Sequence, residues 1–170
     1  MSDLFREQYV DLATRKERIR LFGEECLSTI PNGSLSDGLT LEIGCGHGHW
    51  LTAYSESNPD EPCIGIDLIT KRIEKSNRKR ERLDLPYLFF FKTEAKEFLE
   101  NLPDSLILKR TVLLFPDPWP KKRHHKRRLI QRPFLDLLAA RSVLNAELCF
   151  RTDHQDYFSY MSPPKQIMKI

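Results

Sequence analysis

The feature that most constrains the fold is a short apolar run that ends in closely spaced glycines. Leu39–Ile43 has the length and composition of a buried strand, and Gly44-Cys-Gly-His-Gly48 follows it at once. A helical pattern then extends over residues 47–57. A strand, a glycine loop and a helix in this order are typical of the first half of a nucleotide-binding α/β unit. A tight turn without a ligand is the alternative.

The spacing of the glycines argues against a dinucleotide site. Gly44, Gly46 and Gly48 fall at every second position and position 49 is histidine, so the pattern G-x-G-x-x-G is not met. Glycines let a ligand approach the backbone closely. Glu42, at the end of the strand, is expected to face a cationic group rather than a pyrophosphate. The ammonium group of S-adenosylmethionine, near its sulfonium, meets this requirement.

Further apolar runs predict strands, and helical patterns separate them. The predicted strands cover residues 62–67, 87–91, 111–115 and 147–152, and the predicted helices cover residues 71–84, 95–101 and 129–144. In the last helix Leu135, Leu138 and Ala139 are expected to face inward. The alternation of strands and helices predicts an α/β fold with a doubly wound, mainly parallel sheet.

Acidic side chains end or follow the predicted strands. These side chains are Glu42, Asp67, Glu94, Asp117 and Asp153. The carboxyl ends of parallel strands meet at one edge of an open sheet, and ligands bind in the crevice there. One crevice is therefore expected to bring these carboxylates together.

Two of these carboxylates have a second interpretation. Asp67 lies 23 positions after Gly44, an offset that suits hydrogen bonds from two ribose hydroxyls. A lone aspartate at a strand end can also cap the next helix, but we expect the ribose role, with Thr70 as the cap instead. Glu94 either accepts a hydrogen bond from an adenine amino group or opens the helix that begins at Ala95.

A proline-rich loop and a run of positive charge follow the strand at residues 111–115. Three prolines within Pro116–Pro120 hold Asp117 and Trp119 in a stiff loop, because each proline fixes φ and removes a backbone donor. Trp119 either stacks on a base or is a buried anchor. Six Lys/Arg and two His make up Lys121–Arg128, which favours phosphate contact over an ordinary solvated helix start. A base and a phosphate backbone are expected at one site.

Two other segments are rich in charge, although the net charge of the chain is only +3. Residues 3–30 have the spacing of one or two helices, and their basic side chains are expected to form a solvated face. Those side chains are Arg15, Lys16, Arg18 and Arg20. Residues 71–84 carry seven basic residues and a thin apolar stripe. A solvated face is the default interpretation of that helix, and RNA contact remains open.

The composition fits one soluble domain. With 170 residues, 40% of them hydrophobic, the chain can bury a core, and residues 1–38 are expected to pack as a helical segment and linker on a domain of residues 39–170. No apolar run of about 18 residues predicts a membrane span, and no apolar secretion signal opens the chain. The cysteines have no metal-like spacing and are expected to be packed thiols in a reducing compartment, the cytoplasm. They are Cys26, Cys45, Cys63 and Cys149.

With these motifs described, the chain resembles the tRNA (guanine-N7-)-methyltransferase family, which has the class I, Rossmann-like fold of S-adenosylmethionine-dependent methyltransferases. The matching segments are Leu41–Gly48, Gly65–Asp67, Phe115–Arg128 and Arg151–His154, and Pro-Asp-Pro-Trp-Pro-Lys is the most specific string. The resemblance covers about residues 39–160. The family's last strands have no counterpart in residues 162–170, so the sheet is expected to lack them.

The resemblance implies methyl transfer from S-adenosylmethionine to N7 of a guanine in the variable loop of tRNA. It implies cofactor binding by Glu42, Gly44, Gly46, Gly48, Asp67, Glu94 and Asp117. It also implies a catalytic carboxylate at Asp117, together with substrate contacts. Those contacts come from Lys121, Arg123, His124, His125, Lys126, Arg127, Arg128 and Asp153.

Guanine N7 has a lone pair and no proton, so this reaction requires no general base. Asp117 is expected to accept hydrogen bonds from guanine N1–H and the exocyclic amine, and to offset positive charge on the purine. Two rivals remain: a tRNA-binding family member with weak or no turnover, and a nicotinamide-dependent oxidoreductase. The second leaves the basic run unexplained. A monomer and a homodimer are both open.

Overall fold

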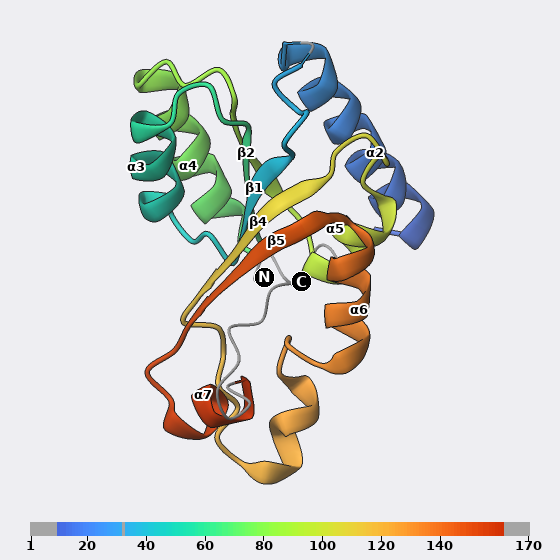
Figure 1. Cartoon of the computed structure of the whole chain (residues 1–170), viewed down its shortest axis with the longest axis vertical. Coiled ribbons are helices and arrows are strands. Elements are labelled where there is room, and N and C mark those ends of the chain that lie inside the picture. Colours follow the sequence, from blue (N-terminus) through green and yellow to red (C-terminus); the bar gives the residue numbers. More distant parts are fainter. Residues whose placement is uncertain (1–9, 32, 162–170) are drawn as a thin grey trace.

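The computed structural model describes residues 10–31 and 33–161, which form a five-stranded sheet with helices on both faces (Figure 1). The strands are β1 (Leu39–Ile43), β2 (Cys63–Asp67), β3 (Leu88–Lys92), β4 (Leu108–Leu114) and β5 (Ser142–Arg151). Their order is β3-β2-β1-β4-β5, and each neighbouring pair is parallel. The prediction of a doubly wound α/β fold is confirmed. Residues 3–9 of the predicted N-terminal helices and the C-terminal residues 162–170 lie outside the described part.

Helices alternate with the strands along the chain. They are α2 (Leu12–Thr29), α3 (His49–Ser57), α4 (Thr70–Arg82), α5 (Ala95–Asn101), α6 (Arg132–Ala140) and α7 (Gln155–Met161), with a 3-10 helix η1 (Lys122–Arg127) before α6. Helices α3 and α4 cover one face of the sheet, and α2, α5 and α6 cover the other (Figure 1). The segment between β4 and α6 extends beyond the carboxyl end of the sheet, next to α7.

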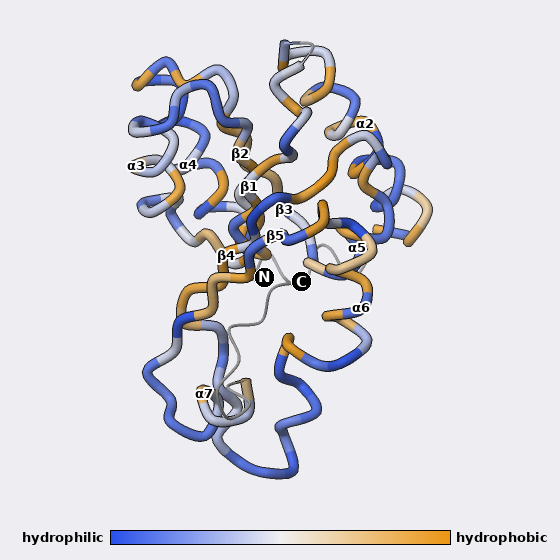
Figure 2. The backbone as a smooth tube through the Cα atoms, viewed as in Figure 1, coloured by the Kyte–Doolittle hydropathy of each residue, from blue (hydrophilic) through white to orange (hydrophobic). Residues whose placement is uncertain are grey.

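Hydrophobic residues are frequent along the central strands (Figure 2), and buried apolar side chains form two core clusters. Every residue of β1 and β2 is buried, as expected for central strands covered on both faces. The larger core cluster includes Ile19 and Phe22 of α2, together with Phe98 of α5. The smaller cluster includes Leu51 of α3 and Ile73 of α4. Helix α2 therefore contributes to the same core as the sheet.

The boundary between α6 and β5 corrects the sequence prediction. A helix was expected over residues 129–144, but α6 ends at Ala140 and β5 begins at Ser142. Ser142 pairs with Leu108 of β4, and the Arg141 guanidinium donates to the carbonyls of Leu99 and Leu102. These long-range contacts override the local helical pattern. The helix buries Phe134 and Leu138, whereas Ala139, expected to face inward, is exposed.

The cysteines are free thiols, and burial raises the pKa of each. Cys26, Cys45 and Cys63 are buried as expected, and the pKa of Cys63 reaches about 12. Cys149 is exposed, contrary to the expected packing, because β5 has a neighbouring strand on one side only among the described residues. In the same part of the chain, no helix is long and apolar enough to cross a membrane.

Candidate functional site

A pocket of about 560 Å³ opens at the carboxyl end of the sheet. Its wall combines the ends of β1, β2 and β4 with the start of α5 and the proline-rich loop. The polar and charged members of the wall are Asp67, Arg72, Thr93, Glu94, Asp117 and Arg127. Three of the five predicted carboxylates therefore lie around one cavity, where an open α/β sheet is expected to bind its ligand.

The three glycines of the loop after β1 have positive φ angles of 74°, 58° and 65°, but they serve different purposes. A Cβ atom on Gly44 or Gly46 would meet no atom within 4 Å. A Cβ atom on Gly48 would lie 2.6 Å from Phe90 Cζ and 2.9 Å from Ser76 Oγ. Gly44 and Gly46 thus leave free space beside the pocket, whereas Gly48 permits close packing of the loop against β3 and α4.

Asp67 holds the glycine loop in place. Its Oδ2 accepts a hydrogen bond from Gly46 N at 3.0 Å, and its Oδ1 accepts one from Ile69 N at 2.8 Å. Arg72 Nη1 lies 3.4 Å from Oδ2. Thr70, expected to cap the next helix, makes no such bond, because α4 begins without a side-chain cap. The prediction for Thr70 is wrong, since Asp67 itself binds the backbone at this turn.

Glu42 is a buried carboxylate with an unsatisfied oxygen. Only 3% of the residue is exposed, and Oε2 has no hydrogen-bond partner among the described residues. Desolvation, followed by repulsion from Asp67, raises its pKa to about 8 against a weaker opposing effect from a backbone hydrogen bond. Glu42 is not part of the pocket wall. A buried polar oxygen without a partner is unusual in a folded protein and requires an explanation.

Glu94 opens α5, one of the two interpretations left by the sequence. Its Oε2 accepts a hydrogen bond from Glu97 N at 2.9 Å, the contact of an N-cap. The residue also lines the pocket. The cap fixes the position of the carboxylate, so the structural role and a ligand contact are compatible.

The proline-rich loop carries strain at both ends. Phe115 and Trp119 have φ angles of 53° and 44°, which are costly for residues with side chains. Between them Asp117 is exposed, lines the pocket, and forms no hydrogen bond or ion pair with the rest of the described chain. The strain and the prolines thus fix an unpartnered carboxylate at the edge of the cavity.

Trp119 combines the two roles considered for it. It is half-buried and lines the pocket, while the guanidinium carbon of Arg127 lies 5.0 Å from its ring centre. His124 approaches the same ring edge-on, with centroids 5.9 Å apart. Trp119 therefore anchors the basic segment to the loop and still presents part of its ring to the cavity.

Arg128 departs from the expectation for the basic segment. No residue of η1 is buried, but Arg128, which follows it, is only 3% exposed. Its Nε donates to the carbonyl of Pro118 at 2.8 Å, and its guanidinium carbon lies 4.6 Å from the ring centre of Tyr157 in α7. Arg128 thus joins the proline-rich loop to α7 rather than facing solvent. A buried arginine in a surface charge run has no signature in the sequence.

Asp153 and His154 lie at the end of β5. Asp153 is exposed but is not part of the pocket wall, so the expected crevice does not include all five carboxylates. His154 Nδ1 is buried without a hydrogen-bond partner among the described residues. Arg72 and Thr93 also line the pocket, although neither was predicted as a site residue. Arg72 could have been found as the basic residue five positions after Asp67.

The parallel sheet with a pocket at its carboxyl end has the Rossmann-like architecture of class I methyltransferases, and comparisons with known proteins agree on this fold. The structure is similar to that of TrmN from Thermus thermophilus, with a TM-score of 0.59 and 16% identity over 84% of this chain and 40% of that one, which supports the fold alone. A family model described as "Putative methyltransferase" matches residues 36–164. The chain belongs to this methyltransferase family.

Several curated relatives of this chain share the same name. A tRNA (guanine-N(7)-)-methyltransferase of Wolbachia pipientis is 35% identical over 122 residues, which are 72% of this chain and 55% of the relative. A tRNA (guanine-N(7)-)-methyltransferase of Methylococcus capsulatus is 39% identical over 123 residues, which are 72% of this chain and 53% of the relative. The resemblance found in the sequence is thus confirmed, and the chain spans about half the length of these relatives.

Proposed function

We propose that the protein transfers a methyl group to N7 of a guanine in tRNA, with S-adenosylmethionine as the methyl donor. One observation carries the proposal: a single cavity is bordered by the glycine loop, by Asp67 and Glu94, and by the strained loop with Asp117. The names of the curated relatives support the choice of substrate.

The residues present fit the proposed cofactor. Gly44 and Gly46 leave room for a ligand beside the loop, and the unsatisfied Glu42 Oε2 suits a cationic ligand. Asp67 is the expected acceptor for ribose hydroxyls, and Glu94 for an adenine amino group. The cofactor supplies an electrophilic methyl group on a sulfonium. The protein itself contributes shape, orientation and negative charge at the edge of the pocket.

Asp117 is the proposed catalytic residue. Methylation at N7 leaves positive charge on the purine, and a fixed carboxylate stabilises that charge. Because no other described side chain occupies its hydrogen-bonding capacity, Asp117 can accept from guanine N1–H and the exocyclic amine. Trp119, at the same wall, offers a surface on which a base can stack.

The exposed cations around η1 are the proposed contacts to tRNA phosphates. They are Lys121, Arg123, Lys126 and Arg127, with the half-buried His124 and His125 between them. Asp153 stays a candidate substrate contact from the end of β5. The free cysteines are compatible with the cytoplasm as the expected compartment.

The test is methyl transfer from labelled S-adenosylmethionine to unmodified tRNA, with cofactor binding followed by calorimetry in the same preparation. Label at guanine N7 is the expected result. Binding of cofactor and tRNA without label would favour the tRNA-binding alternative. Absence of cofactor binding would overturn the interpretation of the glycine loop.

A further inference from the structure

Helix α4 carries a dense row of cations that the proposed reaction does not use. Residues 71–82 include seven Lys or Arg and two Glu. Arg72 pairs with Asp67, and Arg80 donates to the carbonyl of Leu88. The remaining cations form no ion pair with the part of the chain that the structure describes; they are Lys71, Lys75, Arg78, Lys79 and Arg82. These five of the seven cations of this helix therefore have no ion-pair partner among the described residues, although Glu74 and Glu81 lie on the same helix.

Part of the row lies directly beside the glycine loop. Lys79 Nζ donates to the carbonyl of His47 at 2.9 Å and lies 3.1 Å from His49 Nδ1. Desolvation and repulsion from surrounding cations lower the pKa of His47. The repelling groups are Lys75, Arg72, His49 and Lys79. The positive charge at this point comes from the lysines: Lys75 is exposed beside the two exposed histidines, and Lys79 is half-buried between them and α4.

The row also reaches the pocket. Arg72 of α4 lines the cavity, and Arg127 of η1 lines it as well. The two arginines belong to segments separated by β3, α5 and β4 in the chain. A polyanion with one residue in the cavity would therefore meet positive charge from both segments.

We propose that the α4 surface, defined as His47, His49, Lys75 and Lys79, is a second contact for the phosphate backbone of the tRNA. The inference depends on the proposed function, because it requires an RNA whose base enters the pocket. Clustered cations without counter-ions bind phosphates with little base specificity and release condensed ions when they do so. The tRNA then spans the pocket, held by η1 and by the α4 surface.

Helix α2 provides the matched control. It lies on the opposite face of the sheet (Figure 1), and two of its four cations are paired: Arg15 with Glu97, and Arg20 with Glu17 and Glu24. Lys16 and Arg18 of α2 are exposed. Replacing them removes the same charge as replacing two lysines of α4, but far from the pocket.

The experiment compares the double variant Lys75→Gln/Lys79→Gln with the control Lys16→Gln/Arg18→Gln. The dissociation constant for unmodified tRNA is measured at several salt concentrations, alongside cofactor binding. We expect the α4 variant to bind tRNA about tenfold more weakly near 0.1 M salt, with the slope of log K against log salt reduced by about 1 to 2. The control should stay within about twofold of the unmodified protein.

Two results would overturn the inference: one rejects only the α4 contact, and the other rejects the tRNA substrate as well. Equal affinities and salt slopes for the α4 variant and the control would remove α4 from the interface while leaving the proposed function intact. Failure of the unmodified protein to bind tRNA, with cofactor binding retained, would reject the tRNA substrate and this surface together. A selective loss in the α4 variant with normal cofactor affinity would establish the second contact.

Discussion

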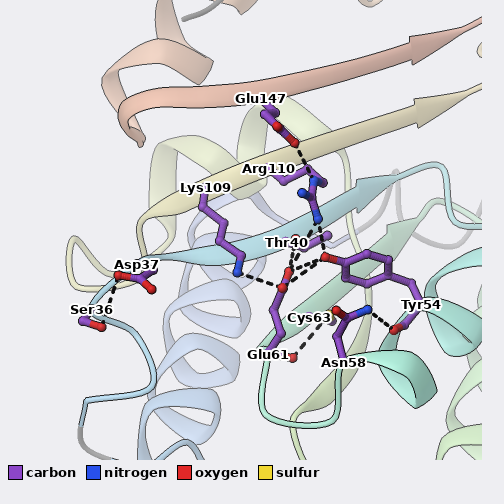
Figure 3. A network of polar contacts seen from close by, with 10 residues as sticks. All are labelled: Ser36, Asp37, Thr40, Tyr54, Asn58, Glu61, Cys63, Lys109, Arg110 and Glu147. Atoms are coloured by element: carbon purple, nitrogen blue, oxygen red, sulfur yellow. Dashed lines mark hydrogen bonds and ion pairs between the residues drawn. The ribbon is translucent and has the colours of Figure 1, made fainter.

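The two ends of the sheet differ in whether their carboxylates have hydrogen-bond and ion-pair partners. At the amino end, Glu61 accepts hydrogen bonds from Thr40 Oγ1 at 2.5 Å and from the Tyr54 hydroxyl at 3.0 Å, and it pairs with Lys109 Nζ at 2.7 Å (Figure 3). Arg110 extends the network by donating to the Tyr54 hydroxyl and to Glu147. At the carboxyl end, Glu42 Oε2 and the Asp117 carboxylate have no partner among the described residues.

The contrast extends to the acidity of the buried glutamates. Burial alone would raise the pKa of Glu61, but hydrogen bonds from Lys109, Thr40 and Tyr54 outweigh burial and lower it. At Glu42 a single backbone hydrogen bond from Leu51 opposes burial and does not outweigh it, so the pKa rises to about 8. One end of the sheet has a complete internal network and serves stability. The other retains unsatisfied groups, as ligand sites do.

The largest effect is expected for the variant Asp117→Asn, which tests the functional role of the carboxyl end of the sheet. It should reduce methyl transfer by at least about 100-fold, because the charge opposite the methylated purine is lost. The melting temperature should not change, since Asp117 is exposed. Steady-state kinetics and thermal unfolding measure the two effects. The control is Asp60→Asn, an exposed carboxylate that precedes β2 at the other end; similar loss in both variants would remove Asp117 from the mechanism.

The variant Glu61→Gln tests the structural role of the amino end of the sheet. It should lower the free energy of unfolding by about 2 kcal/mol. The change leaves Lys109 and Arg110 without their half-buried carboxylate. Urea denaturation measures the stability, and calorimetry measures cofactor affinity. Affinity should be retained. A variant that loses cofactor affinity but keeps its stability would contradict a purely structural role for the Glu61 network.

The pH dependence of the free energy of unfolding tests whether Glu42 is a buried carboxylate without sufficient hydrogen-bond partners. Its folded-state pKa of about 8 lies above the ordinary value of 4.5, so the unliganded protein favours the protonated form. The stability that Glu42 contributes below pH 4.5 is lost progressively as the pH rises towards 8. Glu42→Gln should therefore be about 2 kcal/mol more stable than the unmodified protein at pH 8 and similar to it at pH 5. Parallel pH curves in denaturation experiments would contradict the unsatisfied carboxylate.

The smallest expected effect concerns Arg128, which links the loop of Asp117 to α7. Arg128→Met should lower turnover about tenfold through misplacement of the loop, and Arg128→Lys should recover part of it. The salt dependence of tRNA binding should not change, because Arg128 is buried. A reduced salt slope would instead make Arg128 a phosphate contact, as the sequence alone suggested.

Elements with strong local signals were predicted well. The bounds of β1 and α5 agree with the sequence prediction, because the glycine loop ends β1 locally and the Glu94 N-cap begins α5 locally. The end of α6 was not predicted, since the chain enters β5 at Ser142, which pairs with Leu108 of β4. Local periodicity carries no information about a pairing partner 34 positions away in the chain.

The candidate site also contains residues whose positions were predicted from the sequence and residues whose positions were not. The sequence predicted that acidic residues at strand ends lie together, and Asp67, Glu94 and Asp117 do line one pocket with Gly44, because parallel strands bring those ends together. The sequence assigned Glu42 and Asp153 to the same crevice, but neither is part of the pocket wall. It also counted Arg128 with the exposed cations, although its guanidinium is enclosed by Pro118 and Tyr157.

The sequence by itself determined the alternation of strands and helices, the class of fold, the family, and the chemical types gathered at one end of the sheet. These follow from short-range periodicity, glycine and proline geometry, and the order of motifs along the chain. Only the tertiary structure decided which charged side chains have a partner and which remain unpaired. Pairing depends on distance and burial in space: Glu61 meets Lys109 from a strand 48 positions away, whereas Glu42 meets no cation within the described chain.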